Sequence, residues 1–188
     1  MARTQRRPVE DFEAILRAIS SQKGVVILVG GHAVNVWALS YHDRLGDVLR
    51  SVNGLPKLDA HSAISLEVCG HAVPVLFPHL LIQAKLENAF RLDQRERQDV
   101  KHVKIMALVL REFLLDVVTT ASVENEKPAL QLLRNVLAVL TSDNAREFTR
   151  RHRLTLIDIM PVEALQSSPL RKLANFGQKE LPRAITRG

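Results

Sequence analysis

The amino-terminal third of the chain mixes helical and extended hydrophobic patterns. Residues 9–19 carry apolar side chains at helical spacing, which predicts an amphipathic helix. Five consecutive apolar residues at 25–29 then predict a buried strand, and Gly30 and Gly31 end it. Residues 33–41 return to helical spacing. The pattern therefore predicts a helix, a buried strand, a tight glycine turn and a second helix.

The segment from residue 62 to residue 77 has the pattern of a β-hairpin. Residues 62–69 alternate between apolar and polar positions, and residues 72–77 form a returning apolar run. Gly70 and His71 supply the expected turn between the two strands. Pro74 lies within the second strand, and a proline there favours an edge position because it cannot donate a backbone hydrogen bond.

From Pro78 onward the hydrophobic period is helical. Polar residues interrupt it at 121–127, Pro128 lies near the start of the next helix, and Ser142 can cap another. The last dozen residues are basic, and we expect them to be loose. The predicted helices cover residues 79–92, 95–119, 129–140, 145–152, 162–165 and 170–176.

These patterns together predict an α+β fold. A small mixed sheet occupies the first part of the chain, and a helical carboxy-terminal half follows it. We accordingly divide the chain into a shortened α/β core over residues 1–77 and a helical region over residues 78–188 that packs on this core. A chain of 188 residues with 46% apolar composition is large enough to bury one such core.

Composition adds two constraints on function. The chain has 26 Lys and Arg against 20 Asp and Glu, and a net charge of +6 favours phosphate-bearing partners or a solvated basic surface. Cys69 is the single cysteine, so an intramolecular disulfide and a cysteine metal cluster are both excluded. We therefore expect a reducing, cytoplasmic setting. No apolar run reaches the ~18 residues of a membrane span, and we expect no membrane partner.

Three segments in order resemble motifs of the nucleotidyltransferase superfamily with a polymerase-β-like fold, in the branch of small bacterial enzymes that includes abortive-infection toxins. Residues 28–37 resemble the opening strand, glycine pair and helix. Residues 75–91 resemble the last core strand, a proline and a helix that carries a lysine. Residues 95–102 resemble the segment whose Arg and Asp open the next helix. The similarity covers roughly residues 25–119.

The resemblance implies a nucleotide site and its partners. Glycines let backbone approach phosphate, and the amino terminus of a helix favours anions. The nucleotide-binding residues implied are Gly30, Gly31, His32, Lys85, Arg95 and Asp99, with Lys85 approaching phosphate and Asp99 or Arg95 ordering the site. The implied activity moves a nucleoside monophosphate from a nucleoside triphosphate to a protein or RNA hydroxyl with Mg²⁺. The branch also implies an antitoxin-like protein partner.

The acidic residues depart from the pattern of this family. Two metals require a paired Asp-x-Asp on the strand after the glycine helix, and the sequence contains no Asp-x-Asp. Asp43 and Asp47 are four residues apart, which places them ~13 Å apart on a strand. We therefore infer an internal deletion of the metal strand. Asp47 is then the surviving catalytic and metal-binding acid, and Glu67 is its rival candidate.

Three functional hypotheses follow from this departure. The chain is an active nucleotidyltransferase with Mg²⁺, a catalytically inactive nucleotide-binding or protein-interaction module of the same fold, or a remnant whose shortened sheet drives homodimers or aggregates. Simpler roles stay open for single residues. Lys85 can be a buried helix lysine, and His102 can pair with Asp99 one turn away. A basic cluster at residues 146–153 suits nucleic acid or a solvated face.

Overall fold

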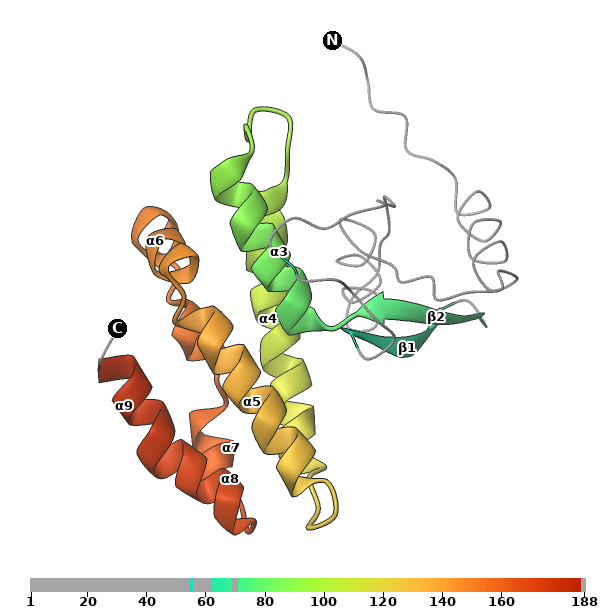
Figure 1. The fold of residues 1–188 in the computed structure, drawn as a ribbon, viewed down its shortest axis with the longest axis vertical. Helices are drawn as coiled ribbons and strands as arrows, with labels where there is room; N and C mark the ends of the chain where they lie inside the picture. Colours follow the sequence, from blue (N-terminus) through green and yellow to red (C-terminus); the bar gives the residue numbers. More distant parts are fainter. Residues whose placement is uncertain (1–54, 56–61, 69–70, 187–188) are drawn as a thin grey trace.

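The computed structural model describes Leu55 and residues 62–68 and 71–186. Within these ranges the fold is α+β, with one two-stranded sheet and a larger set of helices (Figure 1). The α+β class predicted from the sequence is therefore confirmed. The elements predicted for residues 9–41, including the glycine turn, lie outside the described residues, as do His32 and Asp47.

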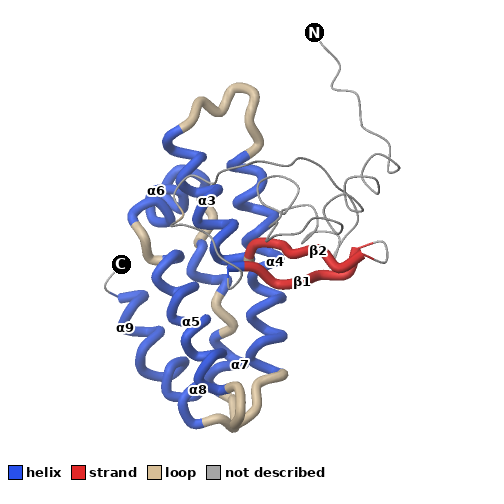
Figure 2. Tube along the Cα trace, turned by 45° about the vertical axis from the view of Figure 1, so that its right-hand side comes forward, coloured by secondary structure: helices blue, strands red, loops and turns tan. Residues whose placement is uncertain are grey.

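The predicted hairpin is present. Strand β1 (Ala63–Val68) pairs antiparallel with β2 (His71–Leu76), so the second strand begins one residue earlier than its pattern indicated. Pro74 faces Ser65 in the register, and Val73, Val75 and Leu76 are buried in the core. The hairpin projects from the amino-terminal end of the helix that starts at Pro78, as the red strands in Figure 2 show.

Two long helices follow the hairpin and pack against each other. Helix α3 (Pro78–Arg91) begins with a proline at its first position, which suits a residue without an amide hydrogen. Helix α4 (Asp99–Thr119) returns beside it after a short loop. The predicted start of this second helix at residue 95 is wrong by four residues. The loop extends to residue 98, and the side chains of Asp93 and Gln94 form hydrogen bonds within it.

The hydrogen bonds of this loop explain where α4 begins. The Asp93 carboxylate accepts from the Arg95 amide at 3.0 Å, which closes a local turn. The Gln94 side chain donates to the carbonyl oxygens of Asn88 and Leu92, both at 2.9 Å, and so completes the end of α3. These side-chain contacts satisfy backbone groups at the end of α3 and in the loop that follows it.

The remaining helices cover the first pair. Helix α5 (Glu126–Leu140) lies beside α3 and α4, and α6 (Asp143–His152) packs on α3. The predicted cap at Ser142 is confirmed, because its hydroxyl accepts from the Ala145 amide. Short elements then complete the layer: η2 (Leu156–Ile159), α7 (Val162–Gln166), α8 (Arg171–Asn175), the π-helical η3 (Phe176–Glu180) and α9 (Leu181–Thr186).

The carboxy-terminal end is helical up to Thr186, so the expectation of a loose tail is wrong. Phe176 and Leu181 are fully buried and join the main core, which holds the segment in place. Arg134 on α5 also donates to both carboxylate oxygens of Glu180, at 2.7 and 3.0 Å. The five-residue elements here carry too little periodic signal to predict this order from sequence.

Gly177 allows η3 to approach α7 closely. A Cβ atom at this position would lie 2.7 Å from the Cβ of Leu165, which is closer than two carbons can pack. The helical layer therefore depends on a glycine at this crossing. Within the described part of the chain, none of the helices combines the length and the apolar character needed to cross a bilayer.

Candidate functional site

Lys85 and Asp99, named by separate motifs, meet across the α3–α4 contact. The Lys85 Nζ atom lies 2.9 Å from Asp99 Oδ1. Both residues are buried, with 4% and 2% of their surfaces exposed. Asp99 is the first residue of α4, where a negative charge also suits the helix dipole. A buried ion pair therefore joins the middle of α3 to the start of α4.

Arg97 completes the environment of the Asp99 carboxylate. Its Nε atom lies 2.5 Å from Asp99 Oδ2, so each carboxylate oxygen accepts from a different cation. Arg97 comes from the loop before α4 and is partly exposed. We refer to Lys85, Arg97, Asp99 and His102 as the Asp99 cluster. Its members come from α3, the connecting loop and the first turn of α4.

The charges of this cluster fix its protonation. Burial would raise the pKa of Asp99, but the hydrogen bonds from Arg97 and Lys85 outweigh it and hold that pKa below its ordinary value. His102 lies one turn from Asp99 on α4. Burial, together with the nearby Lys85 charge, lowers the pKa of His102 to about 4. At neutral pH the carboxylate is therefore ionised and the imidazole is neutral.

The net charge of the cluster decides its chemistry. Within the described residues, Asp99 is the only acid in ion-pair contact with Lys85 or Arg97. Two cations and one carboxylate leave one net positive charge, and neutral His102 adds none. The His102 Nδ1 atom is also buried, without a hydrogen-bond partner in the described structure. The surplus positive charge is carried by the partly exposed Arg97, and the buried imidazole nitrogen of His102 has no partner among the described residues.

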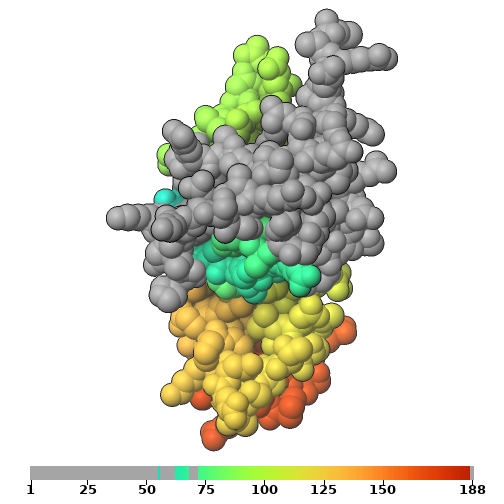
Figure 3. Space-filling view, turned by 90° about the vertical axis from the view of Figure 1, so that its right-hand side faces the viewer, coloured from blue at the N-terminus to red at the C-terminus, as the bar shows by residue number. Residues whose placement is uncertain are grey.

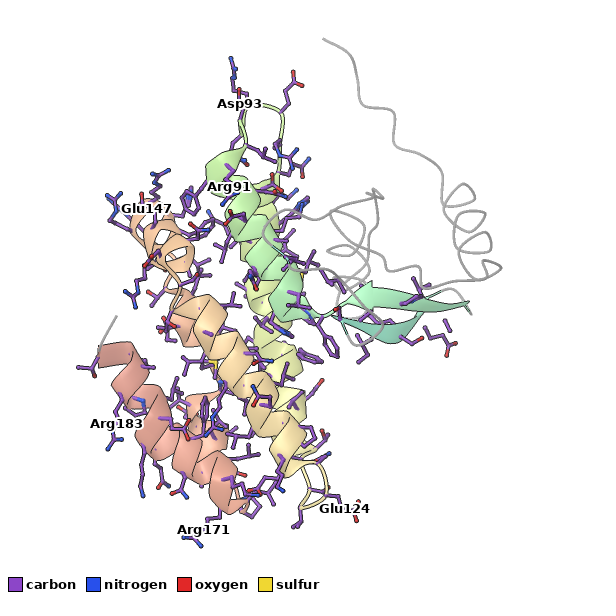
Figure 4. All side chains as sticks on the ribbon, in the orientation of Figure 1. Arg91, Asp93, Glu124, Glu147, Arg171 and Arg183 are labelled. Carbon is purple, nitrogen blue, oxygen red and sulfur yellow. The ribbon has the colours of Figure 1, made fainter. Side chains whose placement is uncertain are left out.

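Arg95 does not join this cluster. It lies in the exposed loop and forms an ion pair with Asp93 instead. Figure 4 labels Asp93 at the tip of the loop that connects α3 to α4, away from the body of the helices. Of the predicted residues, the structure thus brings together Lys85 and Asp99 and separates Arg95 from them. Gly30, Gly31, His32 and Asp47 lie outside the described residues.

The contact of Arg97 with Asp99 was not predicted from the sequence. The sequence does contain a signal for this contact, because Arg97 lies two positions before Asp99 in the same charged motif as Arg95. Apolar periodicity does not tell which of the two arginines turns inward. Glu67, the rival acid, lies exposed on β1. Among the described residues, no three His, Cys, Asp or Glu side chains group as metal ligands.

A second buried histidine lies at the start of α3. His79 is 7% exposed, and its ring packs 5.8 Å from the ring of Phe77. Burial lowers the pKa of His79 to about 4, and its Nδ1 atom has no partner in the portion of the structure described. We therefore treat His79 as a core residue that its burial holds neutral.

The basic cluster predicted at residues 146–153 is partly neutralised. Glu147 accepts from both Arg150 and Arg151, and these hydrogen bonds lower the pKa of Glu147 to about 2. The Arg151 guanidinium also lies 5.0 Å from the centre of the Phe90 ring. Figure 4 labels Glu147 on α6 among nitrogen-tipped side chains. These contacts favour a solvated helix face over a dedicated nucleic-acid groove.

No protein-family model, curated protein or solved structure matches this chain. The resemblance to the nucleotidyltransferase superfamily therefore stays a prediction that is carried by the motifs alone. The geometry of the Asp99 cluster is independent of that resemblance.

Replacing Asp99 by Asn should destabilise the fold strongly. The amide keeps the shape of the side chain but leaves the buried Lys85 ammonium without its counter-charge, which costs about 3 kcal/mol of unfolding free energy. Urea unfolding of Asp99→Asn measures this loss. Asp93→Asn, which breaks the exposed pair with Arg95, is the matched control and should have little effect. Equal losses in the two variants would contradict a special role for the buried pair.

Acid should destabilise the protein through His79. The pKa of His79 is about 4 in the folded state and near 6.5 in the unfolded chain. Between these two pH values the unfolded chain binds one more proton than the folded protein. The free energy of unfolding therefore decreases as the pH is lowered. From pH 7 to pH 5 this one residue removes about 2 kcal/mol. His79→Gln should reduce the difference between unfolding free energies at these two pH values by a comparable amount. An unchanged difference would show that His79 titrates normally.

Proposed function

We propose that this chain is a nucleotidyltransferase-like protein that binds a nucleoside triphosphate. Transfer of a nucleoside monophosphate with Mg²⁺ to a protein or RNA hydroxyl is its ancestral chemistry, impaired here because the sequence has no Asp-x-Asp. The position of Lys85 against Asp99 supports this proposal, since the resemblance placed both residues at one site. The single Cys69 fits a cytoplasmic location.

The observation that carries the proposal is the surplus positive charge of the Asp99 cluster. Asp99 neutralises the buried Lys85, so the surplus charge lies on the partly exposed Arg97, where a triphosphate can contact it. Lys85 is held by Asp99 and is therefore a fixed charge rather than a mobile side chain. Fixing the ammonium before the ligand arrives lowers the entropic cost of binding. Phosphate then meets an ordered lysine and a partly exposed arginine.

The missing acidic pair favours binding without efficient transfer. Nucleotidyl transfer needs two metals ~4 Å apart, which clamp the entering and leaving oxygens. Asp47 alone supplies one carboxylate, so it can contact the Mg²⁺ that accompanies the triphosphate but cannot hold both metals. An inactive nucleotide-binding module of the same fold, with an antitoxin-like protein as its partner, is the form of the proposal that this chemistry favours.

Nucleoside triphosphate should raise the melting temperature of the chain. At a ligand concentration 100 times the dissociation constant, binding adds about 2.7 kcal/mol to the stability of the folded state. Differential scanning fluorimetry with millimolar ATP or GTP and Mg²⁺ measures the shift. Lys85→Met, compared with its own ligand-free melting temperature, should lose the shift because the fixed ammonium is gone.

Arg95→Met is the matched control, because it removes an exposed cation of the same motif that pairs with Asp93 outside the cluster, and it should keep the shift. Incubation with an α-phosphate-labelled triphosphate reports turnover in the same samples, and Asp47→Ala should abolish any labelling that occurs. No shift with either nucleotide would contradict nucleotide binding. A shift that survives in Lys85→Met would show that the nucleotide binds away from the Asp99 cluster.

A further inference from the structure

The last helical run of the described chain lies along α5. Elements α8, η3 and α9 follow one another without a break over residues 171–186, which we refer to as the carboxy-terminal strap. Lys172 pairs with Glu126 near the start of both helical segments, and Glu180 pairs with Arg134 farther along. In each pair the partners are 46 residues apart in the sequence. A constant separation means that α5 and the strap are parallel, as Figures 1 and 2 show.

Glu126 serves the amino-terminal ends of two helices at once. It is buried in the first turn of α5, and its Oε1 atom accepts from the Lys172 amide in the first turn of α8, 2.8 Å away. Leu170, the residue at the cap position of α8, has no side-chain cap hydrogen bond. Parallel packing brings two partly positive helix ends together, and the Glu126 carboxylate offsets both. In Figure 3, orange-red atoms of the carboxy-terminal part lie at the molecular surface beside the yellow atoms around residue 125.

The strap has little helical stability of its own. Gly177 and Pro182 lie inside the run, where glycine has a low helix propensity and proline lacks the amide hydrogen that a helix needs. Most of the other side chains are exposed, and Figure 4 labels two of them, Arg171 and Arg183. The buried residues of the strap are Leu173, Phe176, Gly177 and Leu181. Its order therefore depends on these few apolar contacts and on the two ion pairs with α5.

We propose that the strap opens and closes as one unit in the folded protein, and that Glu126 and Arg134 set how often it opens. A strap that leaves α5 also loses its helix, because Gly177 and Pro182 weaken the helix and its cap comes from α5. Docking and helix formation are therefore coupled, and the loss of one contact is transmitted along the whole run. The α3–α4 pair stays closed, since its ion pair and its apolar contacts lie elsewhere in the core.

Hydrogen–deuterium exchange of the full chain at neutral pH, followed by mass spectrometry, tests this proposal. In the wild type, the amides of residues 171–186 should exchange together and about a hundredfold faster than those in the middle of α4. Glu126→Ala removes both the charge and the acceptor of the Lys172 amide, so it should raise the exchange rate of the whole strap about tenfold. Glu126→Gln keeps an acceptor oxygen without the charge and should raise this rate less.

Variants at exposed positions keep the test available if Glu126→Ala does not fold. Arg134→Ala breaks the pair with Glu180 and should raise the exchange rate about threefold along the whole strap. Arg150→Ala breaks an exposed ion pair on α6 and is the matched control, which should leave the strap unchanged. The proposal is overturned by a wild-type strap that exchanges as slowly as α4, by no increase in the alanine variants at positions 126 and 134, by an increase confined to residues next to the mutated contact, or by an equal increase in α4.

Discussion

The Asp99 carboxylate is the contact on which the α3–α4 pair depends. It accepts from Lys85 on one side and from Arg97 on the other, almost fully shielded from solvent. Taking these charges out of water is costly, and only their mutual contacts offset that cost. The first turn of α4 is therefore fixed relative to the middle of α3. The rest of the helical region packs around these two helices, which the ion pair and the apolar core hold together.

The same contact links stability to the proposed nucleotide site. A lysine that is already ordered loses little side-chain entropy on binding phosphate. A mobile surface lysine must first be ordered, which costs conformational entropy. The carboxylate that holds it also leaves one positive charge unbalanced within the described cluster. In the proposed function, binding and fold share residues, and this gives a reason for keeping a buried and costly ion pair in a helix contact that apolar side chains would also fill.

Much of the described fold could be predicted from the sequence, because the hairpin and long helices carry strong periodic patterns. The resemblance named Lys85 and Asp99 as residues of one site, but their ion pair was not predicted. The start of α4 was not predicted, because the loop before it is held by side-chain hydrogen bonds that apolar periodicity does not contain: Asp93 accepts from the Arg95 amide and Gln94 donates to the Asn88 carbonyl. The order of the last helices depends on long-range burial of Phe176, which a local pattern does not contain.

A double-mutant cycle between Lys85 and Asp99 tests the central claim most directly. Unfolding free energies of Lys85→Met, Asp99→Leu and the double variant give the coupling between the two side chains, free of their separate effects on packing. We predict that each single variant loses stability and that the double variant recovers about 2 kcal/mol relative to the sum, because neither buried charge is then left alone. Losses that add within about 0.5 kcal/mol would contradict the claim that this pair organises the α3–α4 contact.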